Sequence, residues 1–191
     1  MDRRELLKMI VAATGAAMVG LPALAQGQAQ AAAKKIHFSD ADVGTLDEIA
    51  ETILPRTKTP GAKDAGTGAF MATFVSDCYT ARQQATFRAG LADIDKRAGG
   101  RFVSLAPQAR TELLRVLDAE ARKHAVEVTE TGTAEAGEVM PHYFTMIKQL
   151  AIFGFFTSKV GATEVLRYVA VPGRYDGDLA YVPGTPAWGT G

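Results

Sequence analysis

The chain has 191 residues, of which 47% are hydrophobic and 22% charged, and this balance is typical of a folded protein rather than a disordered one. Its 21 basic and 21 acidic residues cancel, so the composition does not favour binding to nucleic acid or broad adsorption to anionic membranes. Cys78 is the only cysteine, which excludes an internal disulfide. We expect Cys78 to be buried in a helix, with a bridge to a partner as the alternative.

The first 25 residues are typical of an export signal. Residues 1–8 carry basic side chains, residues 9–21 are uncharged and largely apolar, and Ala23 and Ala25 form a small-x-small cleavage site. The apolar run is shorter than the roughly 20 residues that cross a bilayer. We therefore expect residues 1–25 to be a cleaved signal peptide and residues 26–38 a flexible leader.

The basic residues of this signal form a specific pattern. The pair Arg3 and Arg4 is followed, after one residue, by Leu6, Leu7 and Lys8, which resembles the twin-arginine translocation motif. That route carries folded proteins, so the sequence predicts export to the periplasm by the twin-arginine translocase and points to a cofactor in this chain or in a partner. An ordinary secretory signal that happens to begin with two arginines is the alternative.

A helix is predicted from Ser39 to Leu54. Ser39 and Asp42 have the spacing of a capping box, and Pro55 ends the helix. Its apolar residues recur at helical spacing and form one face. The acidic side chains that we expect on its opposite, solvated face are Asp47, Glu48 and Glu51.

The next segment, residues 56–68, is rich in Gly, Pro, Thr and Lys and predicts a loop. Gly61 and Gly66 have the spacing of a phosphate-binding loop, but Thr67 and Gly68 follow where lysine and a hydroxyl residue are needed. A dinucleotide fingerprint is also absent, because position 71 is methionine and no strand precedes the glycines. We therefore expect no nucleotide cofactor in this chain.

Three further helices precede residue 130. Thr67 is expected to cap the first, Thr80 and Gln83 to begin the second, which runs to Gly99, and Pro107 to begin the third. In the first of these, the residues expected to face inward are Phe70, Met71, Phe74, Val75 and Cys78. In the third they are Ala109, Leu113, Val116, Leu117 and Ala121.

The densest apolar stretch is residues 141–177, which we expect to form the core. Its first helix is apolar around most of its girth, Gly154 interrupts it, and Thr157 or Ser158 caps a second short helix. Residues 178–191 lack periodicity and contain Trp188, so they predict an irregular arm that lies on its own domain or on a partner.

No segment alternates as strands do, so the sequence predicts an all-α fold, an irregular bundle of about five to seven helices over residues 39–177. Catalytic chemistry has little support. Glu120 and His124 lie one helical turn apart and could supply two metal ligands, but a surface ion pair explains them better. We therefore predict no catalytic, cofactor-binding or metal residues.

Two groups of short motifs carry a resemblance to a known family. Residues 53–55 read ILP and residues 59–62 read TPGA; later, GFFTS at residues 154–158 is followed by Tyr168 and Tyr175. In this order and spacing, from about Phe38 to Gly177, the chain resembles subunit 3 of bacterial membrane-associated gluconate 2-dehydrogenase.

The resemblance implies a non-catalytic small subunit of a periplasmic dehydrogenase complex for a sugar, sugar acid or glycoside. Its partners would be a catalytic subunit that binds FAD and a cytochrome c electron-transfer subunit, and it would supply export and folding support to the flavoprotein. We expect the partner to contact exposed aromatic residues, the candidates being Phe155, Phe156, Tyr168, Tyr175 and Trp188. A stand-alone periplasmic helical enzyme or cofactor-binding protein stays open as the alternative.

Overall fold

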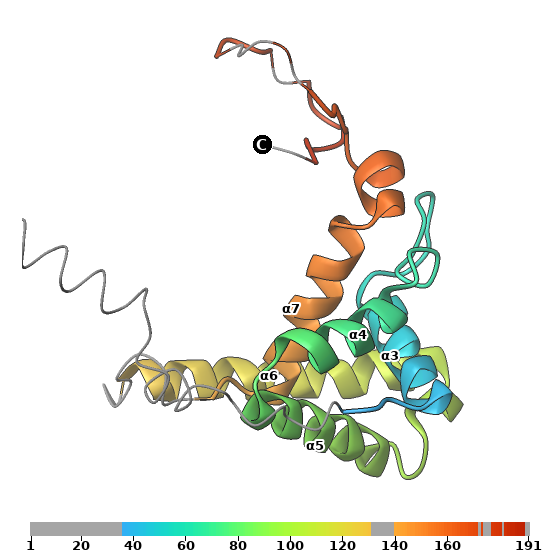
Figure 1. The fold of residues 1–191 in the computed structure, drawn as a ribbon, viewed down its shortest axis with the longest axis vertical. Coiled ribbons are helices and arrows are strands. Elements are labelled where there is room, and N and C mark those ends of the chain that lie inside the picture. Colours follow the sequence, from blue (N-terminus) through green and yellow to red (C-terminus); the bar gives the residue numbers. More distant parts are fainter. Residues whose placement is uncertain (1–35, 131–139, 172, 174–176, 181, 190–191) are drawn as a thin grey trace, which may run out of the picture. The chain divides into compact units, whose positions relative to one another are not determined.

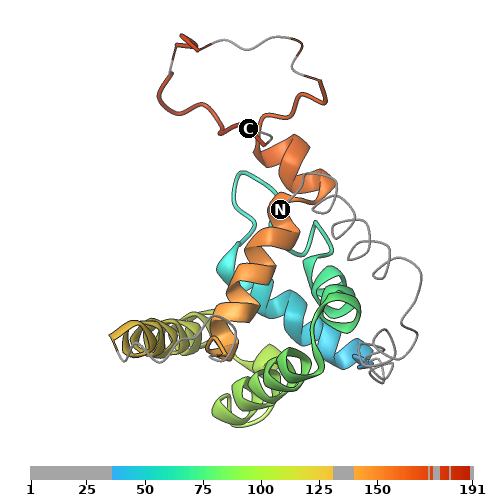
Figure 2. The same ribbon diagram turned by 60° about the vertical axis from the view of Figure 1, so that its left-hand side comes forward.

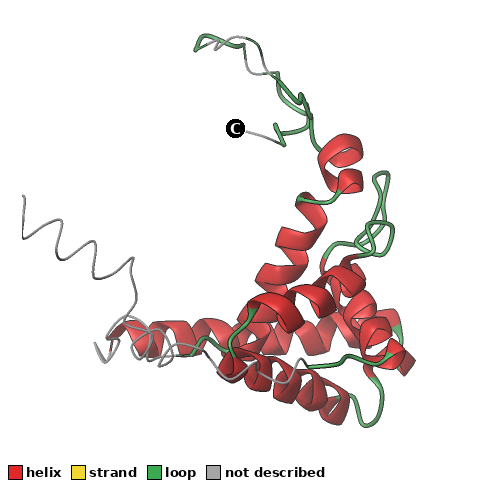
Figure 3. Ribbon diagram, viewed as in Figure 1, coloured by secondary structure: helices red, strands yellow, loops and turns green. Residues whose placement is uncertain are grey.

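The computed structural model describes residues 36–130, 140–171, 173, 177–180 and 182–189. Within these residues the regular structure consists of five α-helices, one 3₁₀ turn and one π-helical turn, without a β-sheet (Figures 1 and 3). The all-α prediction is confirmed for this part of the chain. The predicted signal peptide and most of the leader lie outside it, and the domain boundaries stay predictions.

Helix α3, Asp40–Ile53, begins with the predicted capping box. The Asp42 N–H donates to Ser39 Oγ (3.2 Å), and the Ser39 N–H donates to Asp42 Oδ2 (2.9 Å). These two bonds satisfy amide groups that a helix start otherwise leaves unpaired. Leu54 ends the helix immediately before Pro55.

Helices α4, Thr67–Cys78, and α5, Ala81–Arg97, follow, and α5 begins with the predicted capping box of Thr80 and Gln83. Thr67 does not cap α4. Gly66 occupies the N-cap position with φ +63°, which favours glycine, while Thr67 is buried as the first helical residue and its N–H donates to the Ala62 carbonyl (3.2 Å). Cys78, expected to be buried, is exposed because it lies in the last turn of α4.

A 3₁₀ turn, Phe102–Ser104, leads to the long helix α6, Pro107–Glu130, which begins at proline as predicted. The predicted inward face of α6 is partly wrong. Ala109 and Val116 are exposed, Val116 at 52%, whereas Leu114 is buried beside the predicted Leu117 and Ala121. The face that packs inward is therefore rotated toward Leu114.

Helix α7, Tyr143–Phe156, contacts each of the other four helices and supplies a large part of the core, as the sequence predicted (Figure 1). Half of its fourteen residues are buried. In the other helices the largest fully buried side chains include Leu46, Ile49, Met71, Phe87, Ile94 and Leu117. Figure 2 shows α7 between α6 and α4, with α3 behind it.

Gly154 does not interrupt α7. It is buried where the helix meets α4, and a Cβ built on it would lie 2.5 Å from Cδ1 of Phe70. Glycine is required there for close packing rather than for a break. The helix ends at Thr157, after which Ser158 Oγ accepts the Gly161 N–H (2.9 Å) and starts a short π-helical turn, Gly161–Val165.

Candidate functional site

A partly exposed aromatic cluster lies where the C-terminal half of α7 packs on α4. The Phe153 ring lies 5.9 Å from the Phe70 ring and 5.8 Å from the Phe74 ring, and Phe74 in turn contacts Tyr79. Phe153 is nevertheless 48% exposed. We call Phe70, Phe74, Tyr79 and Phe153 the aromatic surface.

From the sequence we expected Phe153, within residues 141–177, to lie in the core, so the sequence analysis did not predict the aromatic surface. Lys148 and Gln149 form a narrow polar strip on α7, and Phe153 lies one turn after the exposed Gln149 on the same side of the helix. The exposed side of α7 therefore begins with polar residues and continues with an apolar one. That spacing from Gln149 was the available signal. It is weak in a helix that is apolar nearly all round, because hydrophobicity alone does not say which side lacks a neighbour.

The five predicted interface residues have different environments. Phe155 is 3% exposed and belongs to the core, so we exclude it from the interface, and Phe156 is partly buried beside it. Tyr168 and Trp188 are 48% and 45% exposed. Tyr175 lies outside the described residues. Only Tyr168 and Trp188 are thus both described and exposed to the extent that a partner contact needs.

The described part of the C-terminal arm folds back on the chain at Arg167. The Arg167 N–H donates to the Ala187 carbonyl (2.8 Å), and the Gly189 N–H donates to the Arg167 carbonyl (2.7 Å). The Arg167 guanidinium lies 4.2 Å from the centre of the Trp188 ring, a cation–π contact. These contacts close a loop whose exposed large apolar residues include Tyr168, Val169, Val171, Leu179, Val182 and Trp188.

A second surface element is the loop of residues 55–66, which follows α3. Its backbone is bound by carboxylates of that helix: Glu51 accepts the N–H groups of Arg56 (2.8 Å) and Lys63 (2.9 Å). Asp47 accepts the N–H of Gly68, just after the loop (2.8 Å). The acidic face of α3, predicted to be solvated, is therefore half-buried, because it binds the loop.

A polar network ties α5, α6 and α7 together. Tyr143 Oη donates to Asp93 Oδ2 (2.6 Å), and Arg97 donates to both Asp93 (2.7 Å) and Glu120 (2.8 Å). The hydrogen bond from Tyr143 lowers the Asp93 pKa, while burial raises the Tyr143 pKa above its usual value. The tyrosine thus stays a neutral donor and the aspartate a charged acceptor, which suits a structural link between helices rather than proton transfer.

Glu120, which the sequence suggested could form a pair with His124, belongs to this network through Arg97. The His124 ring faces the His142 ring at 6.0 Å. Among the described residues, no group of three or more histidine, cysteine or acidic side chains is arranged to hold a metal ion. His142 instead caps α7: its Nδ1 accepts the Phe144 N–H (3.2 Å).

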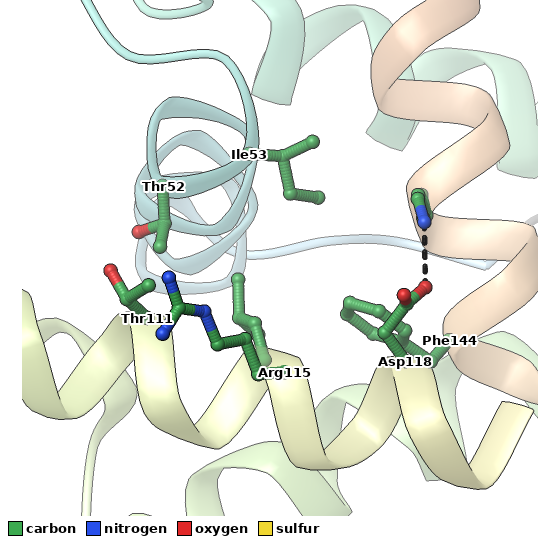
Figure 4. A pocket seen from close by; sticks show the side chains of 8 residues that line it. Thr52, Ile53, Thr111, Arg115, Asp118 and Phe144 are labelled. Atoms are coloured by element: carbon green, nitrogen blue, oxygen red, sulfur yellow. Dashed lines mark hydrogen bonds and ion pairs between the residues drawn. The ribbon is translucent and has the colours of Figure 1, made fainter.

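A small hollow of about 140 Å³ lies between α3, α6 and α7 (Figure 4). Its charged groups are already paired: Asp118 binds Lys148 (2.6 Å) and Arg122 (2.5 Å), and Arg115 binds Glu112 (2.9 Å). Paired charges and a small volume give little basis for a ligand site here.

The amino-acid sequence of these helices matches a known protein family. The family model for gluconate 2-dehydrogenase subunit 3 matches residues 40–173, which run from the start of α3 past the π-helical turn. The chain belongs to the gluconate 2-dehydrogenase subunit 3 family. As the family name states, its members are subunits of a dehydrogenase complex with several different chains. We found no match among curated proteins or solved structures.

This gluconate 2-dehydrogenase subunit 3-like protein has two candidate contact regions on its described surface, the aromatic surface with the arm and the 55–66 loop. None of its described helices combines the length and the apolar character needed to cross a bilayer. The predicted export residues Arg3, Arg4, Leu6, Leu7 and Lys8 and the cleavage residues Ala23 and Ala25 lie outside the described residues.

Proposed function

We propose that this chain is a non-catalytic subunit of a periplasmic FAD-dependent dehydrogenase that oxidises a sugar, sugar acid or glycoside. It binds the flavoprotein catalytic subunit, supports its folding and provides its export signal for the twin-arginine translocase. The observation that carries the proposal is the family match over residues 40–173. A cytochrome c subunit is the further partner that would receive the electrons.

Two features of the sequence support a non-catalytic role for this chain beside a separate flavoprotein subunit. The pair Arg3 and Arg4 begins a twin-arginine-like signal, and this route is suited to a partner that has already folded around its cofactor. The glycines near Gly66 lack the pattern of a dinucleotide-binding loop, since Met71 stands at the third glycine position. We therefore assign FAD to the catalytic subunit.

We place the main partner contact on the aromatic surface, Tyr168 and the arm residue Trp188. Aromatic side chains dominate many protein interfaces, because each buries a large area at a small cost in side-chain entropy. Phe156 and Tyr175 stay candidates for this contact. The Arg167 contact pre-orders Trp188, which reduces the entropy that binding would otherwise cost.

The proposal is tested by purifying the chain from its native host with an affinity tag after Gly191. We expect a yellow complex that reduces an electron-acceptor dye with a sugar or sugar acid, and we expect the chain, once separated, to be colourless and inactive. Flavin or dye reduction that stays with the separated chain would contradict the non-catalytic role. Recovery of the chain alone from active cells would contradict its role as a subunit.

A further inference from the structure

The 55–66 loop combines an exposed tip with a tightly bound base. Residues 55–59 are all exposed, and the Thr57 N–H donates to the Thr59 carbonyl (3.0 Å), which closes the tip. At the base, the Ala62 N–H donates to the Leu54 carbonyl (3.0 Å) and the Gly61 N–H donates to Asp64 (2.8 Å). The chain thus holds a surface loop in one conformation with many hydrogen bonds.

Four carboxylates contribute to this order. Glu51 binds two loop N–H groups and Asp64 binds Gly61 and Arg56, while Glu48 pairs with both Lys63 and Arg110 of α6. Asp47 binds the backbone just beyond the loop. Hydrogen bonds to charged acceptors are stronger than neutral ones, so these contacts fix the loop firmly on α3.

Gly61 also contributes to the order of the loop. A Cβ built on Gly61 would lie 2.5 Å from the Glu51 carboxylate and 2.5 Å from the Arg56 nitrogen. Only a residue without a side chain lets the loop backbone approach Glu51 this closely. The base of the loop contributes the buried Ala62 to the core, whereas the exposed tip contributes nothing to it. Order in an exposed loop lowers the entropic cost of binding a partner.

The charges are separated along the loop. The carboxylates lie at the base, where Asp64 also pairs with Arg56, whereas the exposed tip presents Lys58. Lys58 has no ion pair or hydrogen bond among the described residues. A pre-ordered tip with a basic side chain fits a surface rich in carboxylates, because complementary charges guide association and fix its orientation.

The position of the loop indicates which partner it meets. In both Figure 1 and Figure 2 the loop lies at the same end of the described helices as the C-terminal end of α7. This end of α7 carries Phe153 of the aromatic surface, so the loop would lie beside the contact proposed above.

We propose that the 55–66 loop is a pre-ordered docking element whose tip, through Lys58, binds an acidic surface of the catalytic dehydrogenase subunit. The inference rests on the proposed function, since it requires that this subunit bind the chain. The inference adds a charged contact, made by the loop, to the contact proposed for the aromatic surface.

The test uses the tagged complex from the native host and a carbodiimide, which joins a lysine to a carboxylate only when the two are in contact. We expect a covalent link from Lys58 to an aspartate or glutamate of the catalytic subunit. Lys58→Glu should weaken the complex about fivefold at low salt and flatten the dependence of its affinity on salt. The matched control is Lys123→Glu on α6, a 79% exposed lysine that should leave both unchanged.

A second variant tests whether the order of the loop matters while Lys58 stays in place. Glu51→Gln keeps the shape but leaves only one oxygen for the two N–H donors, so amide hydrogen exchange at Arg56 or Lys63 should become faster and partner binding weaker. Faster exchange with unchanged affinity would overturn the claim of pre-ordering.

The outcomes separate this inference from the function on which it rests. If the wild-type complex forms but Lys58 yields no link and Lys58→Glu keeps full affinity and salt dependence, the loop is not a docking element and the subunit role stands. If the wild-type chain retains no catalytic subunit, both are overturned.

Discussion

His142 couples the start of α7 to pH. Its Nδ1 accepts the Phe144 N–H, and this requires the neutral ring. Burial lowers the His142 pKa most, and the nearby His124 lowers it further; Glu120 opposes this in part, and the weaker effects of Arg97 and Asp93 have opposite signs. Because the folded pKa is below the ordinary value of about 6.5, the stabilisation is fully present above that pH and is lost as the pH falls.

We therefore predict that the free energy of unfolding decreases between about pH 8 and about pH 5, and that His142→Asn makes this decrease smaller. Asparagine is a good helix cap whose oxygen accepts at either pH. Urea unfolding at both pH values measures the effect, with His37→Asn as the control because His37 is exposed. An equal pH dependence in wild type and His142→Asn would be inconsistent with this account.

Residue-scale features that depend on neighbours in sequence could be predicted, and those that depend on tertiary contacts could not. The capping boxes at Ser39 and Thr80 are confirmed, since each needs only a partner three residues away. The burial of Thr67 and the exposure of Cys78 depend on how the preceding loop and the helix end are placed. Nothing local to either residue specifies that placement.

At the scale of elements, α7 shows why glycine can be needed inside a helix. Gly154 allows α4 and α7 to approach until its Cα faces the Phe70 ring, which Phe74 and Phe153 also contact. From the sequence we expected Gly154 to interrupt the helix, because glycine is a weak helix former. The packing with α4 outweighs that propensity.

We predict that Gly154→Ala destabilises the fold by about 1–3 kcal/mol, because the added methyl overlaps Phe70. Gly44→Ala in α3 is the matched control: nothing lies within 4 Å of its Cβ position, so it should stabilise by about 0.5–1 kcal/mol. Thermal or urea unfolding of the two variants compares them directly. Equal stabilisation by both would show that α4 and α7 are not closely packed at this position.

Periodicity and capping residues predicted where the helices lie in the sequence, but they did not always predict which face of a helix packs inward. In α6 the apolar residues Leu113, Leu114, Val116 and Leu117 are compatible with more than one inward face, and the neighbouring helices select the one containing Leu114. The acidic face of α3 was misjudged for a similar reason. Local spacing gives no indication that the following loop folds back onto Asp47 and Glu51.

For the whole molecule, we propose that the chain carries a folded flavoprotein across the membrane. The family match places it in a dehydrogenase complex, and the twin-arginine-like pair Arg3 and Arg4 supports the export route. The order of the family motifs along the chain allowed the family to be predicted from sequence. The proposed partner contact could be predicted from the sequence only in part, because the exposure of Phe153 depends on how α7 packs.

The measurement that tests this claim most directly is the location of dehydrogenase activity in cells carrying Arg3→Lys with Arg4→Lys. The change keeps both charges but removes the paired guanidinium groups, which lysine does not replace in specific recognition. Dye reduction is assayed in the periplasmic and cytoplasmic fractions, with total flavoprotein measured in each. We predict that both this chain and the activity stay in the cytoplasm while the amount of flavoprotein is unchanged; activity that reaches the periplasm at the wild-type level would contradict the escort role.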